Sequence, residues 1–426
     1  MTDYLAIPPA RALAGEVRVP ASKSATNRAL VAAALGREPL EIVGPLESDD
    51  TAALRRCLAA MGAEIVERTG SLSVRGPLEG SAASPTTLDA ADSGTAARFL
   101  AAAAAAVPGR FVLTGSPRLR ERPMGELVDA LRRAGARIEY AEIEGRLPVS
   151  IDGGSLTTGT VTVDASRSSQ FYSALLLAAV AVDGGLAVRA SGEVASAPYV
   201  DMTIETLRAL GHDVSEDCGT IRVRRGRALA ARYEVPGDYS SAVPLIAAVT
   251  AVGGQIRLTG LRWPSADADA RALPVLESMG VALAGSADGI EASAPKRATR
   301  PVSVRAGDFP DAVPALAAVA ALADGPSRFD GVGHLRLKES DRIASLVEIL
   351  TLAGARAFAD GDALVVEGPP RPVPGAVRIP THRDHRMAMA AAILSLRLPS
   401  LLVENPDCVS KSYPGFFRDL ERLRVR

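Results

Sequence analysis

Three of the four lysines in this chain lie in short polar loops, although 44 of its 48 basic residues are arginine. Lys23 and Lys411 each lie between two serines, and Lys338 precedes Glu339 and Ser340. Lysine supplies a compact, strongly hydrated charge whose pKa can be tuned, whereas arginine supplies a rigid planar fork. A lysine kept in an arginine-rich chain indicates a chemical role. These three loops are therefore candidate sites for binding an anion or moving a proton.

Several loops place hydroxyl groups, cations or both near the start of expected helices. They are 20–28, 92–98, 118–123, 166–170, 196–199, 338–342, 383–386 and 410–411. Backbone N–H groups at a helix start, aided by the helix dipole, bind anions without help from a side chain. Each loop taken singly is also typical of a helix cap or a solvated ion pair. Together they gather cations that repel one another unless an anion neutralises them, which predicts a small phosphate-bearing substrate.

The composition argues against several other classes of function. The chain has 426 residues, with 48 basic and 49 acidic side chains and a net charge of -1. We therefore expect no general surface for nucleic acid or membranes. Residues 1–4 lack the pattern of a signal peptide, and the apolar run 100–107 is too short to span a bilayer. The three cysteines, Cys57, Cys218 and Cys408, have no metal-ligand spacing. We expect a cytoplasmic protein without a metal or cofactor.

Regularly spaced helix stops indicate an internal repeat. Gly62, Gly135, Gly211, Gly280 and Gly354 each follow an apolar helical stretch and precede a strand pattern, at intervals of 73, 76, 69 and 74 residues. Glycine ends a helix because it adopts the left-handed conformation at low cost. A sixth helix is expected over residues 416–425.

A second junction, from a strand end through a polar loop into an alanine-rich helix, recurs six times. The six junctions are 19–22, 88–92, 163–166, 235–238, 304–308 and 379–382. Six units of about 70 residues therefore fill the chain. The first and fourth junctions resemble each other, which predicts that the chain crosses there between two domains of three units each. The expected domains are 1–19 plus 237–426, and 20–236.

The hydrophobic patterns predict what these units bury. Helices such as 29–35 and 312–322 are apolar on nearly all sides, so they should lie inside. Strands such as 220–224 and 255–258 alternate between apolar and polar residues, so they should form half-exposed sheets.

At the charged loops the chain resembles the 5-enolpyruvylshikimate-3-phosphate synthase family over essentially its whole length. The motifs that carry the resemblance are Ser22-Lys23-Ser24 with Asn27-Arg28, Gly94-Thr95 with Arg98, Glu121-Arg122-Pro123, Ser168-Ser169-Gln170, Asp311, Lys338-Glu339 with Arg342, Asp384-His385-Arg386, and Lys411. The resemblance implies transfer of the enolpyruvyl group of phosphoenolpyruvate to the 5-hydroxyl of shikimate 3-phosphate, in the shikimate pathway to aromatic amino acids. It also implies an α/β fold of two inside-out α/β barrel domains, built from six βαβαββ-like units, three in each domain. The active site would lie in the interdomain cleft. The protein would be a monomer whose partners are its two small-molecule substrates.

The resemblance further implies which residues bind each substrate. Shikimate 3-phosphate would contact Lys23, Ser24, Arg28, Ser168, Ser169, Gln170, Ser196, Tyr199, Asp311, His334 and Lys338. Phosphoenolpyruvate would contact Lys23, Gly94, Arg122, Gln170, Arg342, Arg386 and Lys411. The two substrates bring roughly five to six negative charges, and seven of these residues are cationic: Lys23, Arg28, Arg122, Lys338, Arg342, Arg386 and Lys411.

The chemistry needs a proton donor for the methylene carbon and an acceptor for the hydroxyl proton. The expected acid–base groups are Asp311 and Glu339, with Lys23 assisting. A sequence does not show which carboxylate holds the proton at each step. His385 is a candidate either for direct catalysis or for orienting a neighbour, and His334 is expected to contact substrate.

Two residues depart from the family pattern beside the expected phosphoenolpyruvate site. Asp92 stands where the family usually has asparagine, and Phe99 stands where its plant-like members have proline. Gly94 is retained, and we therefore expect sensitivity to glyphosate.

The sequence leaves two alternative functions to compare with this one. The sister enolpyruvyl transferase that acts on UDP-N-acetylglucosamine typically has a cysteine in the loop that corresponds to 115–122, and this chain has none there. A repeat-built scaffold without catalysis would not need Asp311 and Glu339 among phosphate-binding cations. Neither a Walker-type loop nor a dinucleotide fingerprint occurs.

Overall fold

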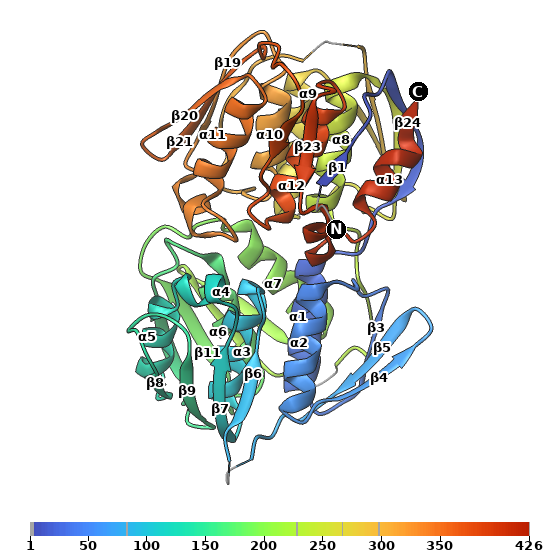
Figure 1. Cartoon of the computed structure of the whole chain (residues 1–426). Helices are drawn as coiled ribbons and strands as arrows, with labels where there is room; N and C mark the ends of the chain where they lie inside the picture. Colours follow the sequence, from blue (N-terminus) through green and yellow to red (C-terminus); the bar gives the residue numbers. More distant parts are fainter. Residues whose placement is uncertain (1–3, 82–83, 227–228, 266, 297–298, 426) are drawn as a thin grey trace. The chain divides into compact units, whose positions relative to one another are not determined.

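The computed structural model describes residues 4–81, 84–226, 229–265, 267–296 and 299–425. The chain divides into two compact units (Figure 1). Unit 1 comprises Met1–Pro20 and Pro236–Arg426, and unit 2 comprises Ala21–Val235. The expected domain boundaries lie within one residue of these limits. The assignment of these units as functional domains stays a proposal. Residues 1–3, on which the signal-peptide expectation partly depends, lie outside the described residues.

Within its described residues, unit 2 contains three sheets of four strands. Their strand orders are β14-β3-β5-β4, β6-β7-β9-β8 and β10-β11-β13-β12. The strands are β3 (Leu40–Val43), β4 (Glu64–Arg68), β5 (Ser71–Arg75), β6 (Thr86–Asp89), β7 (Gly109–Thr114), β8 (Arg137–Tyr140), β9 (Val149–Gly153), β10 (Gly159–Val163), β11 (Leu186–Ala190), β12 (Asp213–Asp217), β13 (Thr220–Arg224) and β14 (Arg232–Glu234).

Unit 1 contains sheets of five, four and three strands in the part that the structure describes. Their orders are β16-β17-β15-β2-β24, β18-β19-β21-β20 and β1-β23-β22. The strands are β1 (Tyr4–Ala6), β2 (Ala12–Arg18), β15 (Gly254–Thr259), β16 (Ala282–Ser286), β17 (Gly289–Ala294), β18 (Ser303–Arg305), β19 (Gly325–Asp330), β20 (Arg356–Asp360), β21 (Ala363–Gly368), β22 (Val377–Ile379), β23 (Leu401–Glu404) and β24 (Arg424–Val425).

One pairing pattern recurs in these sheets. β6 is parallel to β7, β7 is antiparallel to β9, and β9 is antiparallel to β8. The same order of parallel, antiparallel and antiparallel pairs occurs in both other sheets of unit 2, and in β2-β15-β17-β16 and β18-β19-β21-β20. The sheet of β1, β22 and β23 has one parallel and one antiparallel pair. The expected six-fold repeat of a βαβαββ-like unit is confirmed.

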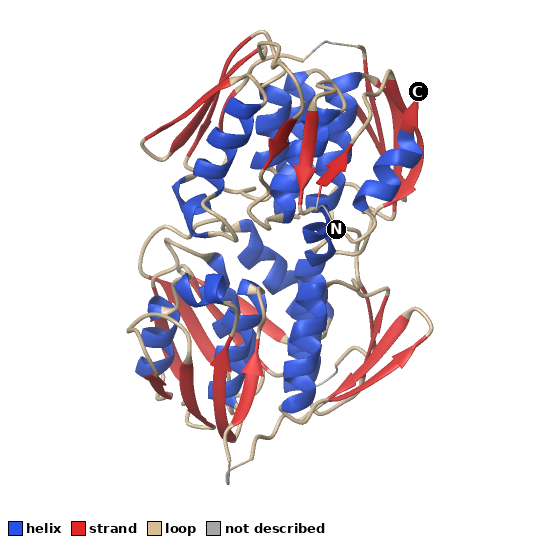
Figure 2. Cartoon of the chain, viewed as in Figure 1, coloured by secondary structure: helices blue, strands red, loops and turns tan. Residues whose placement is uncertain are grey.

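The helices were expected to lie inside the sheets, and Figure 2 shows this arrangement within each unit. Unit 2 has α1 (Lys23–Leu35), α2 (Asp49–Ala60), α3 (Gly94–Ala106), α4 (Pro117–Glu121), α5 (Gly125–Arg133), α6 (Ser169–Ala178) and α7 (Pro198–Ala209). Unit 1 has α8 (Tyr239–Val252), α9 (Leu273–Met279), α10 (Val313–Ala320), α11 (Arg342–Leu352), α12 (His385–Ser395), α13 (Phe416–Leu423) and the 3₁₀ helices η1 (Ala268–Ala272), η2 (Gly333–Leu337) and η3 (Pro406–Lys411).

Three helices form the centre of each unit. In unit 2, α1, α3 and α6 pack against one another, and in unit 1 α8, α10 and α12 do the same. Residues 101–105 of α3, all alanine, have no exposed surface. Their small side chains let neighbouring helices approach closely, which buries each helix on nearly all sides as the sequence predicted.

Parallel strands need a crossover connection, and α3, α6, α10 and α12 supply it in four repeats. In the other two repeats the chain passes between units after β2 and again after β14. As a result β14 pairs with β3 in unit 2, and β2 pairs with β15 in unit 1. This exchange explains why the sequences before the two crossings resemble each other.

The glycine stops occur where they were predicted. Gly62, Gly135, Gly211, Gly280 and Gly354 follow α2, α5, α7, α9 and α11 with φ of 99°, 102°, 87°, 121° and 90°. The helix predicted over 416–425 is wrong at its end. It stops at Leu423, because Arg424 and Val425 form β24 and pair with Leu13 and Ala12 of β2. No helix of the described chain is both long and apolar enough to cross a bilayer.

Candidate active site

In unit 2 the start of α1 carries Lys23, which was predicted to act on both substrates. Ser22 caps the helix by accepting from the backbone N–H of Ala25. The Lys23 Nζ lies 3.0 Å from the Asp50 Oδ2, and the two side chains are 11% and 5% exposed. Asp50 belongs to α2 and was not predicted as a site residue. Asp50 balances the ammonium charge where little water is present, and removal of either partner would leave the other as an uncompensated, largely buried charge.

Arg28 lies one turn further along α1 and is almost fully buried. Its Nε donates to the Thr203 hydroxyl at 2.7 Å, and its Nη2 donates to the Tyr199 carbonyl at 2.8 Å. Its Nη1 donates to the carbonyl of Ser24 at 2.9 Å. The guanidinium also lies over the ring of Phe99, 5.4 Å from its centroid. Arg28 therefore connects α1 to α7 and α3, and its role toward a substrate carboxylate stays a proposal.

The start of α3 brings Gly94 together with two arginines. Arg98 donates to the carbonyl of Gly94 at 3.0 Å and to that of Pro123 at 2.9 Å. A Cβ on Gly94 would lie 2.4 Å from the Nη1 of Arg122. The absence of a side chain at Gly94 is thus what lets the Arg122 guanidinium lie against the helix start. Asp92, one of the departures from the family pattern, accepts a hydrogen bond from the Ser116 hydroxyl.

The starts of α6 and α7 carry the other predicted residues of unit 2. Ser168 caps α6 by accepting from the N–H of Gln170 at 3.3 Å, and Ser169 begins the helix. The Gln170 amide donates to the Thr95 hydroxyl at 3.0 Å, which connects α6 to α3. Ser196 is 5% exposed and has φ of 54°, directly before α7. The cap interpretation of the Ser-Ser-Gln motif is therefore correct for Ser168, whether or not it also binds substrate.

In unit 1 one buried arginine joins three carboxylates. Arg342 begins α11 and is 1% exposed. Its Nε lies 2.8 Å from the Asp384 Oδ2, and its Nη1 lies 2.8 Å from the Asp311 Oδ1. Its Nη2 lies 2.9 Å from the Glu339 Oε2. All three nitrogens of the guanidinium are thus used, and Asp311 and Glu339 are held on the same group.

Arg386 and Lys411 extend this network. Arg386 donates to the Asp311 Oδ2 at 3.1 Å and to the carbonyl and hydroxyl of Ser240 at the start of α8. Lys411 lies 3.6 Å from the Glu339 Oε1. We call Asp311, Glu339, Asp384, Arg342, Arg386 and Lys411 the carboxylate–arginine network. Five of its members were predicted from the sequence as site residues, and Asp384 was not.

The network sets the ionisation of Asp311. Burial disfavours its charged form, but Arg386, Arg342 and Lys338 outweigh that effect and hold the pKa of the carboxyl well below its usual range. The side chain is nevertheless 22% exposed, so it can be reached from solvent. Asp311 is therefore ionised at neutral pH and accessible from solvent in the protein without substrates.

The two histidines near the network differ in setting. Burial, with the charges of Lys338 and Arg342, lowers the pKa of His334 to about 3, so this imidazole is neutral at physiological pH. His385 begins α12 and is completely buried, and its Nδ1 lies 3.7 Å from the Asp384 Oδ1. Burial of the ring favours an orienting role for His385 over contact with a reacting group.

The carboxylates change the charge balance that the sequence suggested. Seven cations were counted as free to meet substrate charge, but Arg342 is already paired with three carboxylates and Lys23 with one. The excess of positive charge is smaller than the motif residues indicated, because the acidic partners were not part of the count. Among the described residues, no three or more His, Cys, Asp and Glu side chains are grouped so as to hold a metal ion.

Comparisons with known proteins cover the full length of both units. A family model described as EPSP synthase (3-phosphoshikimate 1-carboxyvinyltransferase) matches residues 7–420. The chain belongs to this family. A 3-phosphoshikimate 1-carboxyvinyltransferase of Methanospirillum hungatei is 38% identical over 411 residues, which cover 95% of this chain and 94% of the relative. One of Serratia proteamaculans is 36% identical over 434 residues, with 99% of both chains covered.

Solved structures show the same fold. An EPSP synthase from Acinetobacter baumannii superposes with a TM-score of 0.77 and 26% identity, covering 100% of this chain and 99% of that one. The enolpyruvyl transferase NikO from Streptomyces tendae has a TM-score of 0.78 at 22% identity, covering 99% and 97%. The latter likeness shows the fold and no more. The repeat deduced from glycine spacing is thus the fold of this family.

Proposed function

We propose that this protein transfers the enolpyruvyl group of phosphoenolpyruvate to the 5-hydroxyl of shikimate 3-phosphate and releases phosphate. Family membership supports the reaction, and the carboxylate–arginine network supports the chemistry. The observation that carries the proposal is Asp311, an accessible carboxylate kept ionised between two buried arginines. An ionised carboxylate is in the form that accepts the hydroxyl proton. Anionic substrates bound to Arg342 and Arg386 would weaken the effect that keeps the pKa of Asp311 low, which makes Asp311 a stronger base when both substrates are present.

The residues divide the work as follows. Asp311 accepts the proton as the 5-hydroxyl oxygen bonds to carbon 2 of phosphoenolpyruvate. Glu339 delivers a proton to the methylene carbon, which becomes a methyl group, and Lys23 assists. The resulting tetrahedral adduct returns a proton from that methyl group to Glu339 as the bond to the phosphate oxygen breaks, and the proton held by Asp311 passes to the leaving phosphate. This restores the carbon–carbon double bond and frees phosphate.

Binding is divided between the two units. In unit 2, Ser168, Ser169 and Ser196 bind the phosphate of shikimate 3-phosphate and Arg28 binds its carboxylate. Lys23 and Arg122 of unit 2 and Arg342, Arg386 and Lys411 of unit 1 bind phosphoenolpyruvate, with Gly94 beside it. The remaining contacts to shikimate 3-phosphate come from Ser24, Gln170, Tyr199, His334 and Lys338. Candidate residues of both units are thus proposed to act on the same pair of substrates.

His334 and His385 take supporting roles in this proposal. His334 is neutral and contacts shikimate 3-phosphate as a hydrogen-bonding group rather than as a cationic acid. His385 orients Asp384, which in turn orients Arg342. The protein is further proposed to work as a cytoplasmic monomer that needs neither nucleic acid nor a membrane, which light scattering of the purified enzyme and cell fractionation can test.

Phosphate release from phosphoenolpyruvate tests the reaction. Shikimate 3-phosphate and UDP-N-acetylglucosamine are offered as alternative acceptors under the same conditions. We expect release with shikimate 3-phosphate only, and loss of release in an Asp311→Asn variant. Release with only the sugar nucleotide would assign the chain to the sister reaction, and release with neither would leave a protein of this fold without the proposed activity.

A further inference from the structure

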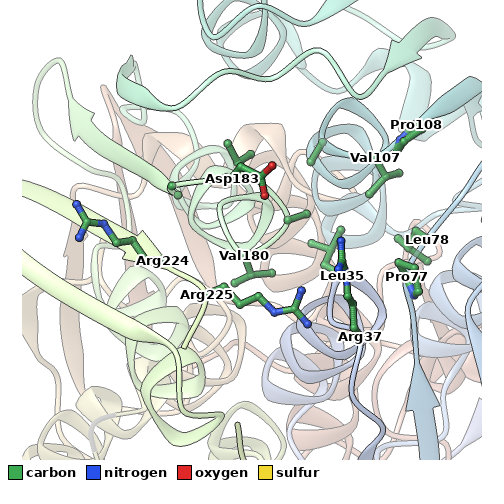
Figure 3. A pocket seen from close by; sticks show the side chains of 15 residues that line it. Leu35, Arg37, Pro77, Leu78, Val107, Pro108, Val180, Asp183, Arg224 and Arg225 are labelled. Atoms are coloured by element: carbon green, nitrogen blue, oxygen red, sulfur yellow. The ribbon is translucent and has the colours of Figure 1, made fainter. Parts of the chain in front are cut away.

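Unit 2 contains a cavity of about 330 Å³ that no part of the proposed reaction uses (Figure 3). It lies where three central helices end: Leu35 is the last residue of α1, Ala106 is the last of α3, and residues 180–185 follow α6. Its volume falls in the range of small-molecule sites, which is roughly 300 to 1,000 Å³.

The cavity is separate from the candidate active-site residues of the same unit. Those residues lie at the opposite, N-terminal ends of α1, α3 and α6. Helices α1 and α3 have 13 residues each, and a helix of that length extends about 20 Å. A ligand in the cavity would therefore not overlap the groups at the helix starts.

The inner wall of the cavity is apolar. Leu35, Leu78, Val107 and Val180 line it, and each of these residues is 5% exposed or less. Such a wall favours the apolar body of a ligand, since burying apolar surface is the main source of affinity in concave sites.

Cationic groups border the same cavity. Arg37, Arg224 and Arg225 line it, and Asp183 supplies a carboxylate at the rim. Figure 3 shows the Arg225 side chain directed toward Arg37 and the Arg224 side chain directed away from both. Arg37 lies just past the end of α1, and Arg225 just past β13.

The side chains of Arg37 and Arg225 make no ion pair or hydrogen bond with any described residue. This contrasts with Arg28 and Arg342 of the candidate active site, whose nitrogens donate to protein oxygens. The charge of Arg225 also affects His212. Burial lowers the pKa of His212 to about 4, and the positive charge of Arg225 contributes to the shift. Two guanidinium groups with available donors thus face an apolar wall.

Helix ends account for part of this arrangement. The C-terminal end of a helix carries partial negative charge, so arginines near it are favourable. This electrostatic effect requires only that the arginines lie near the helix ends, without a hydrogen bond. It leaves the five N–H donors of each guanidinium unused, and the planar fork matches the geometry of a carboxylate or a phosphate group.

We propose that this cavity binds a small molecule that carries a carboxylate on an apolar body. Arg37 and Arg225 bind the carboxylate, and Leu35, Leu78, Val107 and Val180 surround the body. The proposal is independent of the reaction assigned above, because none of these residues belongs to the candidate active site.

Calorimetric titration of the whole chain with 3-phenylpropanoate tests the site. A ligand of about eleven non-hydrogen atoms is expected to bind with a dissociation constant in the millimolar range or tighter. The double substitution of Arg37→Gln and Arg225→Gln should weaken binding about tenfold or more. Arg37 is exposed and Arg225 half-buried, so the fold should persist, as circular dichroism can verify. The matched control is Arg137→Gln, an exposed arginine on β8 that does not line the cavity, and it should leave binding unchanged.

Three further probes sharpen the result. The neutral amide 3-phenylpropanamide should bind about tenfold more weakly than the carboxylate, and 2-phenylethylamine and inorganic phosphate should bind more weakly still. The proposal is overturned by the absence of saturable binding, or by binding that the double substitution leaves unchanged, since the carboxylate would then sit elsewhere. Equal or tighter binding of the amide, the amine or phosphate would also overturn it.

Discussion

We predict that Asp384 contributes strongly to the stability of unit 1, although the sequence did not identify it as a site residue. The side chain has no exposed surface. It accepts from the Arg342 Nε at 2.8 Å, the Ser340 hydroxyl at 3.1 Å and the backbone N–H of Arg386 at 2.9 Å. Asp384→Asn keeps the volume and one acceptor oxygen. It replaces the other oxygen by an N–H₂ group that faces two donors.

The size of the effect follows from burial. Removing one partner of a buried ion pair costs about 3 to 5 kcal/mol, because the remaining charge is left in a medium of low polarity. Arg342 keeps Asp311 and Glu339 in the variant, so we expect the lower end, about 3 kcal/mol. With a urea dependence of about 1 to 3 kcal/mol per molar, the midpoint of unfolding should fall by about 1 to 3 M.

Urea unfolding followed by tryptophan fluorescence measures this change in the correct unit. Trp263 is the single tryptophan of the chain. It lies in unit 1, where its ring packs against Gly285. The matched control is Asp360→Asn, which removes a carboxylate 2.7 Å from Arg328 in the same unit. That pair is 40% and 59% exposed, so water can replace it and the midpoint should stay within error. Equal shifts in the two variants would refute the assignment of the effect to burial.

Three other substitutions test the candidate site and the fold. Lys23→Met should lower kcat at least about 100-fold with unchanged circular dichroism, and activity within tenfold of the parent would remove Lys23 from the mechanism. Gly94→Ala puts a Cβ 2.4 Å from the Arg122 Nη1, so the KM for phosphoenolpyruvate should rise about tenfold. The KM for shikimate 3-phosphate should stay unchanged. An equal rise in both KM values would count against a specific role of Gly94 beside phosphoenolpyruvate. The parent enzyme should be inhibited by glyphosate well below millimolar concentrations, which steady-state assays check. His212 has a pKa of about 4 in the folded protein, against about 6.5 when unfolded. Protons therefore bind the unfolded state more tightly, and the free energy of unfolding should fall by up to about 3 kcal/mol between pH 6.5 and 4. His212→Gln should reduce this pH dependence of stability, as measured by hydrogen exchange of unit 2.

The fold was predictable where local rules decide it. A helix that must turn sharply into a strand needs a residue with positive φ, and Gly62 and Gly354 satisfy this as their positions predicted. The alternation in 255–258 likewise matches the burial pattern of β15. The C-terminal helix was overextended for a non-local reason. Arg424 and Val425 complete the edge of a sheet with β2, whose residues lie about 400 positions earlier.

The cations of the candidate site and two of its carboxylates, Asp311 and Glu339, were predicted from the sequence, but Asp50 and Asp384 were not. Lys23 and Arg342 were found because they stand in short polar loops. The groups that hold them, Asp50 and Asp384, lie 27 and 42 positions away in the sequence. No spacing rule connects such pairs, because they meet through packing of separate helices. For the same reason the surplus of positive charge was overestimated.

Helix capping and contacts within the candidate site are alternatives in the sequence, yet in unit 1 one residue makes both kinds of contact. Asp384 caps α12 through the N–H of Arg386, and with its other oxygen it holds the Nε of Arg342. Ser168 similarly caps α6 at the point where Gln170 reaches Thr95. A cap side chain accepts from only one of the first N–H groups, so it stabilises the helix start and leaves other N–H groups able to bind an anion. We therefore predict that losing a cap residue at one of these helix starts impairs substrate binding and stability together.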